Sequence, residues 1–241
     1  MRLSVIIPAY NEAGRIGPTL TRMDAYLSHL GMTYEIVVVD DGSTDTTCEI
    51  VLEMAGAIPA MRLIENGVNR GKGFSVKTGF LNSSGEFVLF SDADLSTPIG
   101  ELERFLPEMD NGADIVIGSR AVRGADIVRR QPLHRMLMGK TFNKIVRLFT
   151  MHGISDTQCG FKLFRRSTCE VLFRLQRVER FAFDAELLFL AKKRGLKIRE
   201  MPVRWINSPE SKVGLVRDSS RMLADIIRVR LDYLKGRYPG L

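Results

Sequence analysis

Short apolar runs alternate with stretches of helical spacing along the first half of the chain. Runs rich in β-branched residues and bounded by turn residues predict strands, whereas apolar positions three and four residues apart predict helices. The predicted strands are LSVIIPAYN (3–11), YEIVVVDDGS (34–43), MRLIEN (61–66), EFVLFSDAD (86–94) and ADIVIGSR (113–120). The predicted helices are RIGPTLTRMDAYLSHLG (15–31), STDTTCEIVLEMAG (43–56), GFSVKTGFLNSSG (73–85) and PIGELERFLPEM (98–109). This alternation is typical of an α/β fold with a mostly parallel sheet flanked by helices.

Polar side chains follow four of these predicted strands at the point where each strand ends. They are Tyr10, Asn11 and Glu12; Asp40 and Asp41; Asp92 and Asp94; and Ser119 and Arg120. Parallel strands end at one edge of their sheet, and ligands bind in the crevice beyond that edge. We therefore expect these side chains to converge on one site.

Two carboxylates lie one residue apart in VLFSDADLST (88–97), directly after a predicted strand. Asp92 and Asp94 repel each other unless a positive charge lies close to both. Carboxylate oxygens are the ligands that Mg²⁺ or Mn²⁺ prefers, and the neighbouring sequence offers neither Cys nor His for zinc. The pair predicts a metal site at which the cation holds a diphosphate. The alternative is a solvated turn in which Asp94 caps a helix.

A second motif, NGVNRGKGFS (66–75), places Lys72 between Gly71 and Gly73. The glycine spacing differs from that of the P-loop and from that of the dinucleotide fingerprint. Glycines beside Lys72 and Arg70 suit a phosphate-rich or sugar ligand that approaches the backbone closely. A tight turn before a helix explains the same pattern without a ligand.

The net charge of +7 originates in one segment of the chain. Residues 120–150 contain eight Lys and Arg residues against Asp126 alone, so the rest of the chain balances with 27 basic and 27 acidic residues. Such a patch suits an anionic partner, which could be a phosphate, a lipid surface or a nucleic acid. A solvated basic face has the same composition.

Two later stretches interleave apolar and basic residues at helical spacing: LHRMLMGKTFNKIVRLFTMHG (133–153) and SSRMLADIIRVRLDYLKG (219–236). Each predicts either a basic amphipathic helix at a membrane interface or an ordinary helix packed on the core. No apolar run approaches the ~18 residues needed to cross a bilayer, and the chain opens on a predicted strand without a signal-peptide pattern. The three cysteines lack metal-ligand spacing and fit reduced thiols. We expect a cytoplasmic protein that is peripheral to a membrane surface.

The motifs SVIIPAYNE (4–12), EIVVVDDGSTD (35–45), NRGKG (69–73) and SDAD (91–94) resemble those of inverting family 2 glycosyltransferases, which have the GT-A fold. Three further motifs are similar to those of the dolichyl-phosphate β-glucosyltransferases and other polyprenyl-phosphate glycosyltransferases. They are GISDTQCGFKLF (153–164), VERFAFDAELLFLA (178–191) and SKVG (211–214). The resemblance covers nearly the whole chain. It implies one domain over 1–241, with a nucleotide-sugar-binding half (1–97), an acceptor half (98–214) and a C-terminal amphipathic helix (215–241).

The resemblance also implies an activity. The chain would transfer glucose, with inversion, from UDP-glucose to a polyprenyl phosphate of the dolichyl type. The reaction would depend on Mg²⁺ or Mn²⁺ and take place at the cytosolic membrane face, with no nucleic-acid partner. Two alternatives stay open: a mannosyl- or N-acetylhexosaminyltransferase of the same fold, and a non-catalytic module that binds anionic lipid through residues 120–150.

Individual residues take their roles from the same resemblance. The nucleotide sugar would contact Pro8, Tyr10, Glu12, Asp40, Asp41, Ser43, Lys72, Asp92 and Lys212, with Asp40 reading the base. The metal ligands would be Asp92 and Asp94, and the acceptor phosphate would contact Arg120 and Arg135. The catalytic residues would be Asp94, Arg120 and Asp156.

An acceptor phosphate needs no general base, because its second pKa lies near ~6 and it is largely dianionic at neutral pH. Catalysis then depends on cations that offset the repulsion between two phosphate groups.

For four further residues the sequence leaves two interpretations open. Asp156 would orient the sugar or a basic neighbour, or shape a turn; Asp184 and Glu186 would bind donor hydroxyls or pair with arginines; Trp205 would lie in the core or stack on a sugar.

Overall fold

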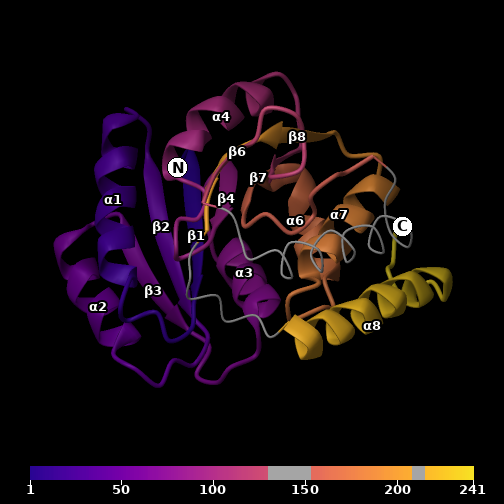
Figure 1. Ribbon diagram of the computed structural model, residues 1–241, viewed down its shortest axis with the longest axis horizontal. Helices are drawn as coiled ribbons and strands as arrows, with labels where there is room; N and C mark the ends of the chain where they lie inside the picture. The colour runs from indigo at the N-terminus through magenta and orange to yellow at the C-terminus, as the bar shows by residue number, and fades with distance from the viewer. Residues whose placement is uncertain (130–152, 208–214) are drawn as a thin grey trace.

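Figure 1 shows the computed structural model of the chain, which describes residues 1–129, 153–207 and 215–241. The strands are β1 (Leu3–Ala9), β2 (Tyr34–Asp40), β3 (Met61–Glu65), β4 (Phe87–Ser91), β5 (Ile115–Ser119), β6 (Asp126–Arg129), β7 (Phe161–Arg165), β8 (Ile198–Pro202) and β9 (Arg204–Ile206). The helices are α1 (Ile16–His29), α2 (Thr47–Ala57), α3 (Lys72–Leu81), the 3₁₀ turn η1 (Ile99–Glu101), α4 (Leu102–Asp110), α6 (Arg166–Leu175), α7 (Phe183–Lys193) and α8 (Leu215–Leu234). Every strand and helix predicted between residues 3 and 120 is present.

Seven strands form one sheet in the order β3-β2-β1-β4-β7-β5-β8, and β6 pairs with β9 in a second sheet. Neighbours in the large sheet are parallel except at β7, which is antiparallel to both β4 and β5. Because β7 opposes both neighbours, β4 and β5 point the same way. The carboxyl ends of β1, β2, β4 and β5 therefore share one edge, and the predicted mostly parallel α/β sheet is confirmed.

Strand β7 is the main difference from the predicted alternation. Its sequence, FKLFR, is mostly apolar but carries a lysine at its second position, and the described residues directly before it, 153–160, form a loop. Phe161 pairs with Ser91 of β4, and Lys162 pairs with Ile117 of β5. The strand thus begins beside the carboxyl ends of its neighbours and brings the residues before it, 153–160, to the same edge of the sheet.

Helices cover both faces of the sheet (Figure 1), and each face has its own apolar core. Side chains alternate between the faces along a strand, so Val5 and Ile7 of β1 pack toward α1, α2 and α4. Ile6, between them, packs toward α3, α6 and α7. Burial on both faces explains the continuous apolar runs of these strands.

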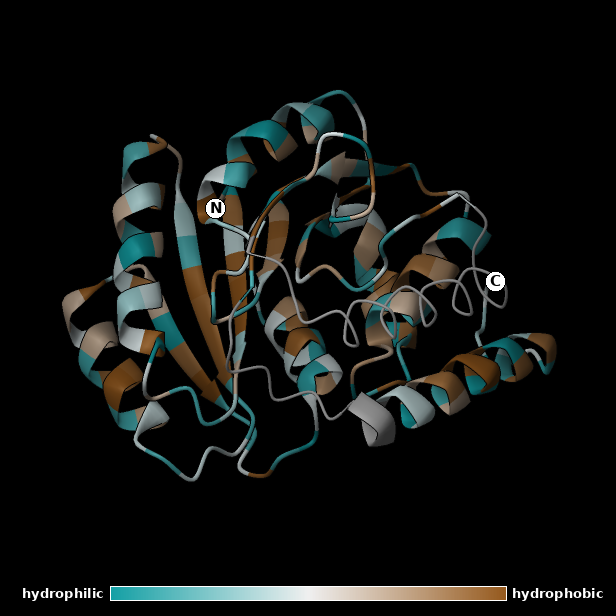
Figure 2. Ribbon diagram, viewed as in Figure 1, coloured by the Kyte–Doolittle hydropathy of each residue, from teal (hydrophilic) through white to brown (hydrophobic). Residues whose placement is uncertain are grey.

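Helix α8 has two apolar stripes, one buried and one exposed, and apolar and polar residues alternate along it in Figure 2. Met222, Ile226 and Val229 are buried against the core that includes α7. A second stripe faces outward: its exposed fractions are 40% at Ile227, 47% at Leu231 and 69% at Leu234. The buried stripe agrees with packing on the core, and the membrane interpretation of this stretch concerns the outward stripe and stays a prediction.

In the part of the chain that the structure describes, α8 and the other helices are too short or too polar to cross a membrane. The other predicted amphipathic stretch, 133–153, lies outside the described residues except for Gly153.

Candidate functional site

The loops after β1 and β2 are tied together at the shared edge of the sheet. Asn11 adopts a φ of 54°, in the left-handed region, and its N–H donates to Ser43 Oγ at 2.8 Å. Three other residues predicted to border the nucleotide lie on the same side: Pro8 within β1, and Tyr10 and Glu12 in the loop that follows. Ser43 thus acts as the bridge between the two loops.

The adjacent carboxylates Asp40 and Asp41 are both buried and have different partners. Asp40 Oδ2 accepts the N–H groups of Gly42 and Ser43, each at 2.9 Å. Asp40 Oδ1 is buried and makes no strong hydrogen bond with the described residues. The thiol of Cys48 lies close by, and burial together with Asp40 raises its pKa to about 12. Asp40 Oδ1 can therefore accept a further hydrogen bond, as can Oδ1 of Asp92 and of Asp184 beyond their lysine contacts.

Asp41 instead organises the glycine-rich loop. Its two carboxylate oxygens accept the N–H groups of Arg70 at 3.0 Å and Gly71 at 2.8 Å, and Asn66 Nδ2 donates to it at 3.1 Å. The backbone amides of the loop thus bind a protein carboxylate. Asp41 therefore shapes the glycine-rich loop, and its predicted contact with the nucleotide sugar stays a prediction.

The glycines of Gly71-Lys72-Gly73 allow close packing within the protein. A Cβ atom at Gly71 would lie 2.6 Å from the carbonyl oxygen of Glu179, and one at Gly73 would lie 2.6 Å from Phe183 Cβ. Gly71 also has a φ of 115°, which side-chain-bearing residues rarely adopt. The structure therefore explains both glycines by the turn and by the approach of α3 to residues 178–183. Between them, Lys72 is held at the start of α3.

Lys72 extends toward the predicted metal site. Its Nζ lies 2.6 Å from Asp92 Oδ1, and the exposed fractions of the two side chains are 26% and 30%. Burial alone lowers the pKa of Lys72, but the carboxylates of Asp92 and Asp184 outweigh it and raise the pKa above its ordinary value. Lys72 is thus a charged partner of Asp92.

Asp94 lies in the turn that follows β4. Its Oδ1 accepts the N–H of Ser96 at 2.9 Å. The residue between them, Leu95, has a φ of 48°, a strained conformation for a leucine that reverses the chain direction. Strain of this kind is common at functional sites, and here it sets the position of the second carboxylate.

The side chain of Asp92 is packed against Gly160, which lies just before β7. A Cβ atom at Gly160 would lie 1.9 Å from Asp92 Oδ2 and 2.3 Å from its Cγ. The N–H of Asp92 also donates to the carbonyl oxygen of Gly160 at 3.1 Å. Only glycine leaves room for the carboxylate, so the position of Asp92 depends on residue 160.

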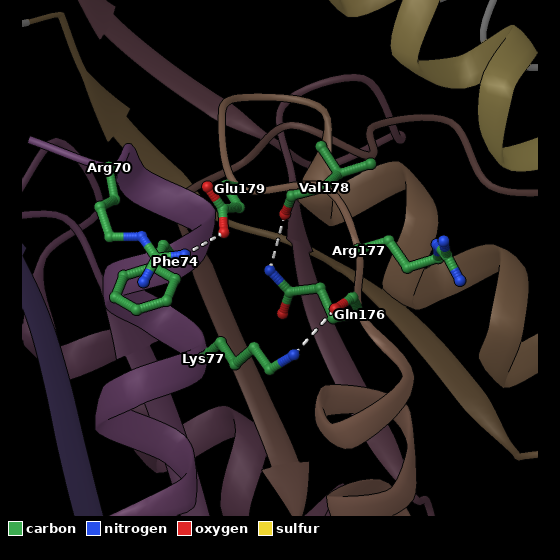
Figure 3. A pocket seen from close by; sticks show the side chains of 7 residues that line it. All are labelled: Arg70, Phe74, Lys77, Gln176, Arg177, Val178 and Glu179. Carbon is green, nitrogen blue, oxygen red and sulfur yellow. Dashed lines mark hydrogen bonds and ion pairs between the residues drawn. The ribbon is translucent and has the colours of Figure 1, made fainter.

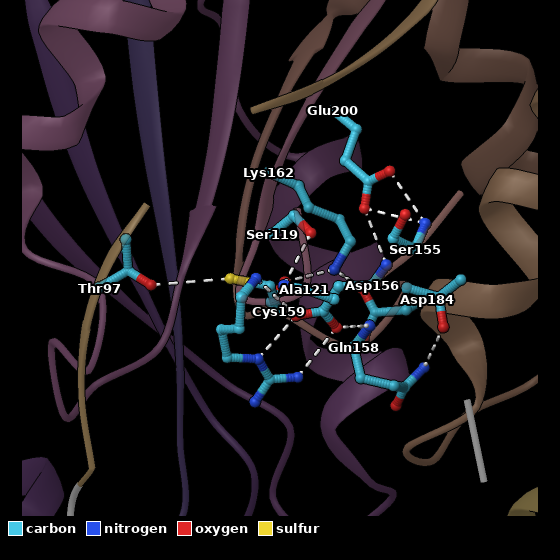
Figure 4. A network of polar contacts seen from close by, with 12 residues as sticks. Thr97, Ser119, Ala121, Ser155, Asp156, Gln158, Cys159, Lys162, Asp184 and Glu200 are labelled. Carbon is cyan, nitrogen blue, oxygen red and sulfur yellow. Dashed lines mark hydrogen bonds and ion pairs between the residues drawn. The ribbon is translucent and has the colours of Figure 1, made fainter. Parts of the chain in front are cut away.

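Arg120, after β5, and Asp156, in the loop before β7, form a two-pronged ion pair. Arg120 Nε donates to Asp156 Oδ2 at 2.7 Å, and Nη2 donates to Oδ1 at 2.9 Å. Asp156 is buried at 1% exposure, and its loop is fastened by Glu200, which accepts the N–H groups of Ser155 and Asp156 (Figure 4). Asp156 thus contacts a basic neighbour, and its Oδ1 also accepts the N–H of Gln158 at 3.1 Å, so the turn interpretation has a contact as well.

The ion pair changes the proton affinities of both partners. Burial alone raises the pKa of Asp156, but Arg120 outweighs that effect and lowers the pKa to about 2. Asp156 is consequently ionised across the range in which proteins work. The pKa of Arg120 is raised by the same contact, despite the opposing effect of burial.

A buried lysine completes the site, and the sequence analysis did not single it out. Lys162 of β7 is 1% exposed; its Nζ donates to the carbonyl oxygen of Cys159 and lies 2.6 Å from Asp184 Oδ1. Asp184, at the start of α7, is therefore paired with a lysine. The two predicted alternatives are a pair with an arginine and contact with hydroxyl groups of the donor. The signal in the sequence was a lone lysine in the apolar run GFKLF, which a buried strand tolerates only when the charge is paired.

Glu186 and Trp205 are both buried, and their contacts bear on the roles predicted for them. Glu186 is fully buried and accepts hydrogen bonds from the N–H groups of Arg177 and Val178 and from Tyr238 Oη at 2.6 Å. Neither predicted alternative describes it, because its partners are backbone amides and a tyrosine. Trp205 is 9% exposed, but it belongs to neither apolar core, and the guanidinium carbon of Arg120 lies 5.4 Å from its ring centroid. The choice between the core and a sugar platform therefore stays a prediction.

The structure thus gathers four carboxylates and three cations at one edge of the sheet. They are Asp92, Asp94, Asp156 and Asp184 with Lys72, Arg120 and Lys162. The predicted convergence of the strand ends is present for these residues. Arg135 and Lys212 lie outside the described residues.

A divalent cation fits the chemistry of this edge. Asp92 and Asp94 offer hard carboxylate oxygens, and Asp92 Oδ1 is buried with only an ion pair to Lys72 as a described contact. In the described ranges, no group of three or more His, Cys, Asp or Glu side chains is arranged to hold an ion. Two carboxylates suit Mg²⁺ or Mn²⁺ that takes its other ligands from water and a diphosphate.

A separate hollow of about 370 Å³ lies between α3 and residues 176–179 (Figure 3). Its lining includes Arg70, Lys77 and Glu179. Lys77 Nζ donates to the carbonyl oxygen of Gln176 at 2.8 Å, and Arg70 pairs with Glu179 at 2.6 Å. Lys77 of α3 and Arg70 of the loop before it are thus occupied by contacts with residues 176–179, before α7.

The depressed pKa of Asp156 predicts a pH-dependent contribution to stability. A carboxyl whose folded-state pKa is lowered stabilises the fold above its unfolded pKa near 3.8, and the stabilisation is lost as the pH falls toward about 2. We expect the difference in unfolding free energy between the wild type and Asp156→Asn to shrink by about 2 kcal/mol between pH 4 and pH 2. Urea denaturation at each pH measures it.

Asp110→Asn is the matched control for that series, because Asp110 is 59% exposed and pairs with Arg2 at the surface. Its difference from the wild type should change little over the same range. A difference for Asp156→Asn that stays constant with pH would contradict the prediction.

Comparisons with known proteins agree with this geometry. The family model described as glycosyl transferase family 2 matches residues 4–173. A dolichyl-phosphate β-glucosyltransferase of Trichomonas vaginalis is 40% identical over 96% of this chain and 71% of its own length. Two solved structures share the fold. A mannosyltransferase of Pyrobaculum calidifontis in complex with GDP-Man and Mn²⁺ has a TM-score of 0.63, with 24% identity over 94% of this chain and 64% of its own. Glucosyl-3-phosphoglycerate synthase of Mycobacterium tuberculosis in complex with UDP has a TM-score of 0.65, with 22% identity over 95% and 80%.

Proposed function

Because this chain belongs to glycosyl transferase family 2 and is a glycosyltransferase, we propose that it transfers glucose from UDP-glucose to a polyprenyl phosphate of the dolichyl type. The transfer inverts the anomeric centre, depends on Mg²⁺ or Mn²⁺ and takes place at the cytosolic face of a membrane. The relative from Trichomonas vaginalis supports glucose and dolichyl phosphate, and the two solved structures support a sugar nucleotide.

One observation carries the proposal: the carboxylate pair after β4 and the Arg120–Asp156 pair after β5 lie at the same edge of one sheet. In this proposal, residues 1–97 bind the donor and residues 98–214 bind the acceptor within one domain. The large sheet supports that division, because β1 to β4 come from the first half and β5, β7 and β8 from the second.

On the donor side, Asp92 and Asp94 hold the divalent cation, which would neutralise the diphosphate of the sugar nucleotide. Lys72 and Lys212 add positive charge for the same phosphates. The unused Oδ1 of Asp40 suits the N–H of a uracil ring, since a buried carboxylate oxygen is stabilised by a donor. Tyr10 and Glu12 border the nucleotide from the β1 loop.

On the acceptor side, the phosphate itself is the nucleophile. Arg120 Nε and Nη2 donate to Asp156, whereas Nη1 has no acceptor among the described residues. Nη1 can therefore donate to the acceptor phosphate. Arg120, with Arg135, would direct the acceptor oxygen toward the face of the sugar opposite the diphosphate. Their charges offset the repulsion between the two phosphate groups, which is the main electrostatic barrier to the reaction.

Labelled glucose supplied as UDP-glucose tests the function directly. With a polyprenyl phosphate in detergent micelles and Mn²⁺, the label should enter the lipid fraction, and EDTA should abolish the transfer. A parallel panel of GDP-mannose and UDP-N-acetylglucosamine identifies the donor. Label that stays out of the lipid with every donor, while the protein still binds vesicles, would favour a non-catalytic lipid-binding module.

The outward stripe of α8 supports attachment to a membrane surface. Ile227, Leu231 and Leu234 are exposed apolar residues one helical turn apart, and Arg228, Arg230 and Lys235 beside them are exposed as well. Such a face inserts apolar side chains between lipid headgroups while its cations contact anionic lipids.

We expect Leu231→Glu to lower binding to anionic vesicles about tenfold, because insertion of one leucine contributes about 1.5–3 kcal/mol. Vesicle co-sedimentation measures the change. Leu52→Glu is the control, since Leu52 of α2 is 57% exposed and lies on the helix layer that packs on the opposite face of the sheet. Equal vesicle binding by Leu231→Glu and Leu52→Glu would show that the outward stripe of α8 does not contact the membrane.

A further inference from the structure

The two lysines of the site differ in how firmly they are held. Lys162 is fully buried and has both a carbonyl partner, at Cys159, and a carboxylate partner, at Asp184. Lys72 is 26% exposed, and Asp92 is its one ion-pair partner among the described residues. Lys162 is therefore a permanent part of the fold, whereas the side chain of Lys72 can leave its carboxylate at the cost of one ion pair and a cation–π contact with Phe90, whose ring centroid lies 5.1 Å from Nζ.

The backbone of Lys72 is fixed even though its side chain can move. Gly71 and Gly73 on either side are packed against residues 179 and 183, so α3 begins at a set position. From there the flexible four-carbon side chain carries the charge to Asp92. Lys72 Nζ is within range of more than one carboxylate, because Asp184 and Asp94 act on it as well.

The position of Lys72 conflicts with a bound metal. A divalent cation on Asp92 would share that carboxylate with an ammonium group 2.6 Å from Oδ1, and two cations so close repel strongly. We propose that Lys72 is a resident counter-ion of Asp92, which a divalent cation displaces only when a diphosphate is present to receive the lysine. This proposal rests on the metal site of the proposed function and adds the order and the coupling of metal and donor binding.

The charges explain why the donor would release the lysine. Without ligands, Lys72 offsets one of the two negative charges of Asp92 and Asp94, so the pair attracts a metal weakly. A diphosphate adds negative charge at the same place and offers Lys72 new oxygen partners. Metal and nucleotide should therefore strengthen each other's binding by the same factor, as linkage requires.

Titration of Mn²⁺ alone, followed by electron paramagnetic resonance, tests this without any turnover. We expect Lys72→Met to bind Mn²⁺ about tenfold more tightly than the wild type in the absence of nucleotide. Lys72→Arg keeps the charge and should retain weak binding. Lys77→Met is the matched control: it removes one charge from the same helix, but Lys77 contacts the carbonyl oxygen of Gln176 instead of a carboxylate of the site.

The second measurement is the effect of UDP on the same titrations. The wild type should bind Mn²⁺ at least about tenfold more tightly with saturating UDP, and Lys72→Met should lose most of that increase; tenfold corresponds to about 1.4 kcal/mol of coupling. Thermal melting checks that each variant is folded, and Lys72→Gln replaces Lys72→Met if the latter is not.

Two results would overturn the proposal. One is Mn²⁺ binding by the Lys72→Met or Lys72→Gln protein that is no tighter than that of the wild type, including no binding by either. The other is an equal increase for Lys77→Met, which would mean that general charge and not this contact is responsible. If either result is obtained while the wild type transfers glucose to lipid, the proposed function stands and the counter-ion role of Lys72 is wrong.

Discussion

Replacement of Asp94 by Asn should lower glucosyl transfer about 1000-fold, which corresponds to about 4 kcal/mol of transition-state stabilisation. The amide keeps the shape and still accepts the N–H of Ser96, so the turn after β4 should remain folded. What is lost is one of two negative charges that would hold the divalent cation against the donor diphosphate. The initial rate of label transfer from UDP-glucose to lipid, at saturating Mn²⁺, measures the effect.

The same variant should keep its stability, because Asp94 is only half-buried and its main-chain contact survives. Thermal melting of Asp94→Asn and of the surface variant Asp110→Asn provides the comparison, and the second should transfer glucose at the wild-type rate. Activity of Asp94→Asn within tenfold of the wild type would show that this carboxylate does not hold the metal.

Gly160→Ala should lower the transfer rate about 100-fold, although the changed residue carries no functional group. The added methyl would lie 1.9 Å from Asp92 Oδ2, so the carboxylate must rotate away from its place beside Lys72. A displacement of about 1 Å at a reacting group costs about 100-fold in rate. The clash is with the end of a side chain, so the fold itself should tolerate the change.

Gly56→Ala is the matched control for this prediction. Gly56 lies in α2, and a Cβ atom there would have no neighbour within 4 Å. Its variant should match the wild type in rate and melt at the same or a slightly higher temperature, because alanine favours a helix more than glycine does. If Gly160→Ala unfolds, Asp92→Asn separates the two effects, since it removes the carboxylate without adding a methyl group. A fully active Gly160→Ala protein would mean that Asp92 needs no fixed position.

The first half of the fold was accessible from sequence because its signals are local. Alternation of apolar strands with helical spacing needs only neighbouring residues, and it predicted β1 to β5 and α1 to α4. Parallel strands also share one direction, so polar residues at their ends had to meet at one edge. For this reason the sequence alone places Asp92, Asp94 and Arg120 in a single site.

The remaining site residues depend on contacts between distant parts of the chain. The reversal of β7 between β4 and β5 brings Gly160 to Asp92 and Asp156 to Arg120, and no local pattern encodes that placement. The burial of Lys162 against Asp184 follows from the same strand.

The pattern of the chain thus determined the class of fold, the edge that carries the site and the acidic pair, because periodicity and strand direction are local properties. Only the tertiary structure decided which cation meets which carboxylate. It places Lys72 on Asp92 and Asp156 on Arg120. Ion pairing depends on distances of a few ångströms between residues far apart in sequence, which composition and spacing do not contain.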